Sequence, residues 1–407
     1  MPLNHSLRLI HTSDWHLGHE LFGHSREAEH DAFLNWLVEQ LAQEQADALV
    51  VAGDVYDVAH PPVAAMERLY RFLREATDRC PHLQIVMIGG NHDSAARINL
   101  PAPLLDQGRV HLLGALPRTR EGPQFDKLCV PLRNRDGAAA AWAVAVPYCR
   151  PGDLGARSLT QLFAEAIDHA EARAGGLPLI ACGHLHVAGG EISEHSERRI
   201  TIGGEEAEAA AMFDARLAYA ALGHLHRPQQ IKGETLIRYS GSPIPLSAAE
   251  RGYRHSIAVV DVGPGGAEAR LIEVPRTVPF LALPEGGPRP IEEVEQALAT
   301  LELDDGLPRN LHPFLEVAVR VEGPEPGLQA RVLAALEGKP VRLTRIVRHT
   351  ARQAESGQIT VRQQDLAELN PEAVFGEMYQ SKFGNPVSED LLRVFQTLLV
   401  EAQGENA

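Results

Sequence analysis

Hydrophobic and polar positions alternate along this chain in a pattern that predicts two kinds of element through about residue 275. Six short apolar runs have the length and composition of buried strands: LRLIH, DALVVA, LQIVMI, AWAVAV, LPLIAC and AYAAL. Between them, apolar residues recur at helical spacing, with one helix expected after Ser25 and another from Pro61 towards Arg79. Strands that alternate with amphipathic helices favour an α/β layered domain.

The pattern changes after the segment EVPRTVP, where Pro and Gly become frequent, and LPEGGPRP has the character of a boundary loop. Beyond it, FLEVAVRVE and VRLTRIVRH are expected to be strands, with helices near residues 291–301 and 328–336. Two further helices are expected to open near Asn370 and Ser388. We therefore expect a large α/β domain over residues 1–275, a small α/β domain over 276–350, and a linker with C-terminal helices over 351–407.

Composition narrows the class of protein. The longest apolar stretch, AAAAWAVAVP, has about half the length that a bilayer requires, and the first residues do not resemble a signal peptide. We therefore expect a soluble, cytoplasmic protein with no membrane partner. Its four cysteines are widely spaced, which favours buried reduced thiols over a disulfide framework or a zinc knuckle. The formal net charge of −16 argues against a general surface for polyanions.

Polar turns follow five of the predicted strands. Their sequences are SDWH, GDVYD, GNHD, GHLH and a second GHLH. Each alone has an ordinary explanation, as a turn, a helix cap or a histidine at a strand edge. Strand carboxyl ends converge on one crevice in open α/β sheets, so we expect the five turns to form one site.

The side chains in these turns are suited to divalent metal ions. Carboxylates, imidazoles and one amide oxygen occur together without a thiolate, which disfavours a structural zinc site and fits Mn²⁺ best. So many ligands exceed what one ion needs, but they suit two ions that share a bridging carboxylate. Asp54, which follows a glycine in GDVYD, is the natural bridge.

The order D-x-H, G-D-x-x-D, G-N-H-D, G-H and G-H-x-H resembles the calcineurin-like metallophosphoesterases, over most of residues 7–262. The resemblance implies two packed mixed β-sheets flanked by helices, with a small α/β capping domain. It also implies two metal sites that share one carboxylate. One metal would be held by Asp14, His16, Asp54 and His226, and the other by Asp54, Asn91, His184 and His224.

The same resemblance gives a catalytic role to the third motif. His92 would lie beside the metals and protonate the leaving oxygen, while Asp93 would accept its other N–H and orient it. The roles of His186 and Asp57 stay open, between a contact with the site and an ordinary structural one. Three arginines beside the motifs, Arg26, Arg97 and Arg227, are either phosphate contacts or solvated surface.

The chain has no G-x-x-x-x-G-K-[ST] motif, so it is not expected to bind a nucleotide by a P-loop, and ATP dependence would come from a partner. Two apolar stripes in the tail either dock on that partner or pack on this chain: Val374, Phe375, Met378 and Tyr379, then Leu391, Val394, Phe395, Leu398 and Leu399. The resemblance implies an SbcC-type ATPase subunit and a homodimer within a heterotetramer.

The function implied is a metal-dependent DNA nuclease in repair, recombination and replication. It would act as an exonuclease on duplex ends and as an endonuclease on hairpins and single strands. One alternative is a phosphatase acting on a small-molecule or protein phosphoester, which the motifs alone do not exclude. Another is a non-catalytic DNA-end scaffold. The presence of every expected metal ligand argues against this alternative.

Overall fold

The computed structural model describes residues 7–105, 108–192, 207–323, 325–350 and 391 of the 407-residue chain. The described residues up to His349 belong to one compact unit. Apart from Leu391, the predicted linker and C-terminal helices of residues 351–407 lie outside the described residues. The predicted division of the chain at residues 275 and 350 stays a prediction.

One six-stranded sheet begins with the first apolar run of the chain. Its order is β16(Gly266–Glu273), β15(Ser256–Gly263), β1(Leu7–Thr12), β4(Ala48–Ala52), β5(Gln84–Ile88) and β6(Val110–Leu113). The last four strands are parallel, whereas β15 and β16 join as antiparallel strands at one side. The sheet is therefore mixed.

A second six-stranded sheet is built from the middle of the chain. Its order is β13(Gln229–Ile231), β14(Leu236–Tyr239), β12(Leu217–Gly223), β11(Leu179–His184), β10(Ala139–Val146) and β9(Cys129–Arg133). The four central strands are parallel and the two edge strands are antiparallel. All six predicted runs are strands, namely β1, β4, β5, β10, β11 and β12.

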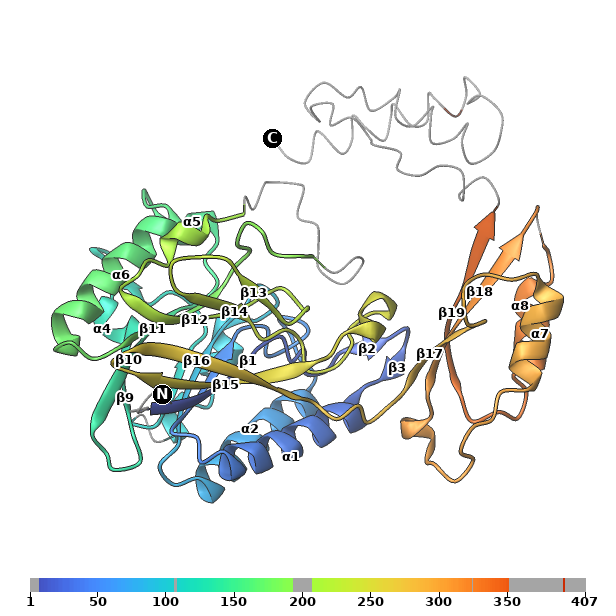
Figure 1. Ribbon diagram of the computed structural model, residues 1–407, viewed down its shortest axis with the longest axis horizontal. Coiled ribbons are helices and arrows are strands. Elements are labelled where there is room, and N and C mark those ends of the chain that lie inside the picture. Colours follow the sequence, from blue (N-terminus) through green and yellow to red (C-terminus); the bar gives the residue numbers. More distant parts are fainter. Residues whose placement is uncertain (1–6, 106–107, 193–206, 324, 351–390, 392–407) are drawn as a thin grey trace. The chain divides into compact units, whose positions relative to one another are not determined.

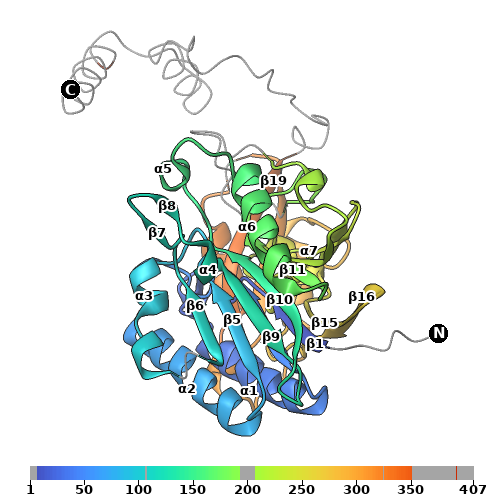
Figure 2. The same cartoon turned by 90° about the vertical axis from the view of Figure 1, so that its left-hand side faces the viewer.

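The two sheets pack against each other because their strands are apolar on both faces. In β4, Leu49 and Val51 pack with α1(Glu27–Gln43) and α2(Val63–Arg79), whereas Val50 and Ala52 pack with the second sheet. The outer face of the second sheet is covered by α6(Leu159–Ala174). Figures 1 and 2 show the sheets between α1 and α2 on one side and α6 on the other. This confirms the predicted layered α/β class.

Short elements complete the large domain. They are α3(Ala95–Asn99), α4(Phe125–Leu128), α5(Pro151–Leu154), the hairpins β2(Glu20–Leu21) with β3(His24–Ser25) and β7(Arg118–Thr119) with β8(Gly122–Pro123), and the 3-10 turns at Ala102–Leu104, Ala210–Met212 and Ala248–Gly252. Among the described residues, no helix combines the length and apolar character needed to cross a bilayer.

A three-stranded sheet begins at Phe280. Its order is β17(Phe280–Leu283), β18(Phe314–Val321) and β19(Arg342–Thr350). Alternate residues of β18, such as Leu315 and Val317, pack with α7(Ile291–Ala299) and α8(Leu328–Ala335). A 3-10 turn lies at Arg309–Leu311. On the other face, Phe314 packs in a cluster with Leu21 of the β2–β3 hairpin. The predicted small α/β layer is thus present, with both helices on one face.

Candidate metal centre

The ends of five strands bring the polar turns to one place. Asp14 and His16 follow β1, Asp54 follows β4, and Asn91 follows β5. In the second sheet, His184 is the last residue of β11, and His224 and His226 follow β12. Ligating atoms of Asp14, His16 and His226 lie within 4.8 Å of one another, and so do those of Asp14, Asp54 and His184.

The amide of Asn91 links the remaining predicted ligands to this cluster. Its Oδ1 lies 2.8 Å from Nε2 of His184 and 3.2 Å from Nδ1 of His224. All seven residues predicted to bind metal are therefore gathered, although they come from both sheets. His186 belongs to none of these groups, and its imidazole lines a neighbouring pocket.

Asp54 occupies the centre of the cluster. Its Oδ2 lies 3.6 Å from Nε2 of His16 and 3.4 Å from Nε2 of His184. Its Oδ1 accepts a hydrogen bond from the backbone N–H of His92 at 2.9 Å. The carboxylate is thus oriented by the third motif and faces an imidazole from each of the two predicted metal sites.

The backbone at the cluster is held in an unfavourable conformation. Asp14, His16, Asp54 and His224 have φ angles of 53°, 46°, 49° and 102°. Positive φ is uncommon outside glycine, and such strain is found where a site requires it. Among the described residues only Phe22 and Gln45 share this feature without belonging to the cluster.

Two glycines give these side chains room. A Cβ at Gly53, whose φ is +89°, would lie 2.3 Å from Nδ1 of His184. A Cβ at Gly90 would lie 2.2 Å from Oδ1 of Asp54. The glycines of GDVYD and GGNHD are therefore needed because a neighbouring cluster residue fills the space of a side chain.

The hydrogen bonds of His184 test whether the cluster suits a cation. Nδ1 of His184 donates to the carbonyl oxygen of Ala52 at 2.9 Å, so Nε2 of the neutral ring carries a lone pair. That lone pair faces two oxygen atoms, from Asn91 at 2.8 Å and from Asp54 at 3.4 Å. A lone pair that faces two oxygen acceptors is stable only with a cation or a proton between them. Nε2 of His16 is also buried and has no hydrogen-bond partner among the residues that the structure describes. The donor set fits divalent metal ions.

Charge within the cluster shifts the pKa values of its members. Burial alone would lower the pKa of His184, but the carboxylate of Asp54 outweighs it and raises that pKa to about 9. Burial disfavours ionisation of Asp54, yet His184 and His16 outweigh this effect and hold its pKa below the usual value. Burial lowers the pKa of His16, and burial together with His184 lowers the pKa of His224 to about 3. His16 and His224 are therefore neutral at neutral pH, as metal binding requires.

Two carboxylates orient imidazoles of the cluster by accepting hydrogen bonds from their Nδ1 atoms. Glu250, which is fully buried, accepts a hydrogen bond from Nδ1 of His226 at 3.0 Å. Asp57 accepts from Nδ1 of His16 at 3.2 Å and from Nδ1 of His19 at 3.0 Å. Such contacts set the ring orientation and basicity of a metal ligand. No sequence motif pointed to Glu250, because it lies in a 3-10 turn away from every strand end that the pattern predicted.

The predicted contact between His92 and Asp93 is wrong. Nδ1 of His92 donates instead to the backbone carbonyl oxygen of Asp57 at 2.7 Å. The Asp93 carboxylate accepts from the backbone N–H groups of Val55, Tyr56 and Gly90 at 3.0, 2.9 and 2.9 Å. Asp93 therefore braces the loop after β4, because the buried turn has amide groups that need an acceptor.

Arg26 fits neither of the two roles considered for it, a phosphate contact or solvated surface. Its side chain is buried, forms an ion pair with Glu29 and donates to the carbonyl oxygen of Pro245 at 2.6 Å. Its guanidinium lies 5.0 Å from the ring of Phe314 in β18. Arg26 thus links the large domain to the three-stranded sheet, and its guanidinium is not available to bind a phosphate. Arg227 is exposed and forms an ion pair with Glu191.

The four cysteines are free, but only Cys129 and Cys182 are buried, whereas Cys80 and Cys149 are partly exposed. The prediction of reduced thiols outside any disulfide is confirmed for all four. The prediction that all are buried is wrong for two, because Cys80 ends α2 and Cys149 lines a pocket.

Comparison with known proteins gives two family matches. The model of the calcineurin-like phosphoesterases matches residues 7–228, and that of the Type 5 capsule protein repressor C-terminal domain matches residues 276–383. A Rhodobacter capsulatus protein, named as the SbcD subunit of the SbcCD nuclease, is 44% identical over 390 residues, which cover 92% of this chain and 94% of that protein. Its namesake in Escherichia coli K12 is 31% identical over 98% of this chain and 100% of that protein.

Proposed function

Because this chain belongs to the calcineurin-like phosphoesterases and, within them, to the family of SbcD nuclease subunits, we propose that its cluster holds two divalent metal ions and cleaves DNA phosphodiesters. The chain is a metal-dependent phosphodiester hydrolase and a nuclease subunit. The observation that carries the proposal is the close approach of Nε2 of His184 to two oxygen atoms, Oδ1 of Asn91 and Oδ2 of Asp54.

Each ion has its own ligands in this proposal. Asp14, His16 and His226 hold the first ion, and Asn91, His184 and His224 hold the second. Asp54 serves both, because its Oδ2 faces an imidazole of each set. The ions are Mn²⁺, since the mixture of carboxylates, imidazoles and an amide without thiolate suits that ion.

The mechanism divides the work between the ions and the protein. Two bound divalent ions supply the charge that activates a water molecule and stabilises the phosphodiester during in-line attack. Nδ1 of His92 is fixed as a donor to the carbonyl oxygen of Asp57, so Nε2 is the atom that can carry a proton to the leaving oxygen. Asp93 maintains the loop that presents this histidine. Burial of the ligands keeps bulk water from competing with them.

Membership of the SbcD family supports a proposal for the substrate and the partners. The chain acts with an SbcC-type ATPase subunit, as a homodimer within a heterotetramer in the cytoplasm. It degrades duplex ends as an ATP-dependent exonuclease and cuts hairpins and single strands as an endonuclease. A groove of about 490 Å³ beside the cluster, lined by His16, His92 and His226, is open to solvent and gives a strand access.

The test is cleavage of an end-labelled hairpin duplex by the full-length chain with Mn²⁺, with and without the ATPase subunit. We expect cutting of the hairpin loop by the chain with Mn²⁺, and ATP-dependent shortening of the duplex only with the partner present. Hydrolysis of phosphate monoesters without any cleavage of DNA would contradict the proposal.

A further inference from the structure

A pocket of about 450 Å³ opens beside the metal cluster on the side of the second sheet. We call it the Tyr148 pocket; its walls come from residues 147–163, which follow β10, from residues 184–186 at the end of β11, and from Glu208. His184 belongs both to this wall and to the cluster. The pocket therefore adjoins the cluster at His184.

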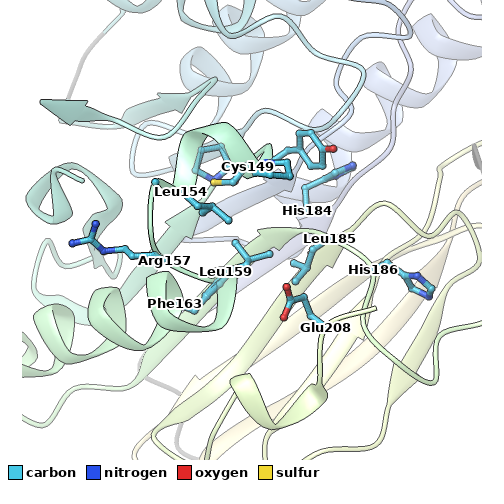
Figure 3. A pocket seen from close by; sticks show the side chains of 13 residues that line it. Cys149, Leu154, Arg157, Leu159, Phe163, His184, Leu185, His186 and Glu208 are labelled. Carbon is cyan, nitrogen blue, oxygen red and sulfur yellow. The ribbon is translucent and has the colours of Figure 1, made fainter. Parts of the chain in front are cut away.

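The interior of the pocket is apolar. Leu154, Leu159, Phe163 and Leu185 line it, and Figure 3 shows Leu185 between His184 and Glu208, with the other three side chains to the left of them. Tyr148 adds an aromatic ring whose centre lies 6.3 Å from that of His184, with the ring planes at 86°. Apolar walls with one aromatic ring and a few polar groups are typical of sites for planar organic molecules.

The charged groups of the pocket disfavour a phosphate. Arg157 is hydrogen-bonded to Glu165 through Nε at 3.0 Å, and in Figure 3 its guanidinium points away from the leucines. The carboxylate of Glu208 lies on the wall and accepts a hydrogen bond from Thr160 at 3.1 Å. A carboxylate repels phosphate but can accept from the ring N–H or amino group of a nucleobase. The pocket thus suits an uncharged planar group.

The position of the pocket indicates which nucleoside of a phosphodiester substrate it can accommodate. The groove of about 490 Å³ meets the cluster at His16, His92 and His226, whereas the Tyr148 pocket meets it at His184. Within the described part of the chain, the two share no lining residue. A phosphodiester has two nucleoside substituents. The substituent that leaves departs on the side of His92, so the other can be accommodated by the Tyr148 pocket.

We propose that the Tyr148 pocket binds the nucleobase of the nucleotide that remains attached to phosphorus during cleavage. This inference rests on the proposed function. The base lies against Tyr148 and the leucines, and stacking of this kind tolerates every base. Its role is to hold the scissile phosphate at the metals, so that a substrate without a base at this position is cleaved less efficiently.

The test compares two kinds of diester with the same leaving group, using the full-length chain with Mn²⁺. One set is thymidine 5′-(p-nitrophenyl phosphate) and its 3′ isomer, and the other substrate is methyl p-nitrophenyl phosphate, which has no base. Stacking contributions predict that kcat/KM for the better thymidine isomer exceeds that for the methyl ester by about 5- to 150-fold. The ratio of the two values cancels any general loss of active enzyme.

Filling the pocket should abolish that ratio. Leu159→Trp is expected to bring it to about 1, whereas the matched variant Leu104→Trp, at a leucine that is 90% exposed and outside the pocket, keeps the wild-type ratio. The inference would be overturned if the ratio were near 1 in the wild-type protein, or if Leu159→Trp kept the ratio of the wild type. In either case, hydrolysis of both diesters would still support the proposed function. Failure to hydrolyse any diester would refute the proposed function, and the inference with it.

Discussion

Nδ1 of His226 donates a hydrogen bond to Oε1 of Glu250 across 3.0 Å, and both side chains are buried. Oε2 of the same carboxylate accepts from the backbone N–H of Leu246 at 2.8 Å. Glu250 therefore fixes the orientation of a proposed metal ligand and is itself fixed by the loop before the 3-10 turn.

We predict that Glu250→Gln weakens metal binding by about 10- to 100-fold, the usual cost of losing the orienting partner of a ligand. Activity should recover largely at saturating Mn²⁺, so the metal concentration for half-maximal cleavage would rise more than kcat falls. Glu234→Gln, at an exposed position, is the control. Unchanged metal dependence in Glu250→Gln would show that His226 needs no such partner.

Asp54→Ala should reduce cleavage of every substrate to background, because Oδ2 of Asp54 faces both proposed metal sites. Calorimetry should show weaker binding of both ions, while Asp136→Ala, in an exposed turn, behaves as wild type. Loss of only one ion would contradict the assignment of Asp54 as a shared ligand.

His92→Ala should keep both ions and slow cleavage by about 10²- to 10⁴-fold, the contribution of a positioned general acid. The defect should shrink for a substrate with a p-nitrophenolate leaving group, which needs no protonation. His82→Ala, at an exposed position, serves as the control. An equal defect with both leaving groups would assign His92 another role.

Metal binding and pH should be linked through His184, whose pKa is raised from 6.5 to about 9 in the metal-free protein. Below pH 9 an ion must displace a proton from Nε2, so the apparent affinity should rise about tenfold per pH unit from pH 6 to 8. In the metal-free protein the sign is opposite: the protonated ring stabilises the fold fully below pH 6.5, and this stability is lost as pH rises towards 9.

Thermal unfolding between about pH 6 and 8 would check both signs, since the Tm without metal should fall with pH while the increase on adding Mn²⁺ should grow. Calorimetry in two buffers gives an independent measurement of the number of protons released when the metal binds. A metal-induced shift that does not change with pH would contradict this linkage.

Truncation after Arg362 should leave the metal cluster and Mn²⁺-dependent cutting of single-stranded DNA intact, because all the proposed ligands precede residue 227. Removal of the two apolar stripes of the tail should abolish binding of the SbcC-type ATPase and ATP-dependent processing of duplex ends. Unchanged affinity for the ATPase in a titration would mean that these stripes have another role.

The local pattern was sufficient for the strands that carry the site. The strands that lead to the site are mostly apolar runs because they are largely buried on both faces, and a polar turn follows each of these five. The strands that the pattern did not reveal include β16, which has no buried residue and three charged ones. β15 is an apolar run that the same criterion should have found.

The candidate ligands were predictable for the same reason, since residues at strand ends have a place in the fold that depends on the strand alone. Contacts across the fold were not. Glu250 comes to His226 from a turn with no motif, and Asp93 turns to the amides of Val55 and Tyr56 instead of its neighbour His92. These contacts were not predictable because they depend on which buried hydrogen-bond donors need an acceptor after the segments have packed together.

The sequence by itself determined the layered class, the strand ends and the chemical character of the cluster, because these follow from hydrophobic period and from residues adjacent in the chain. Only the tertiary structure decided that Arg26 is buried under Phe314 and that an apolar pocket adjoins His184. Burial and unsatisfied hydrogen-bond groups are properties of packed neighbours from distant segments, and no local pattern encodes which segments will meet.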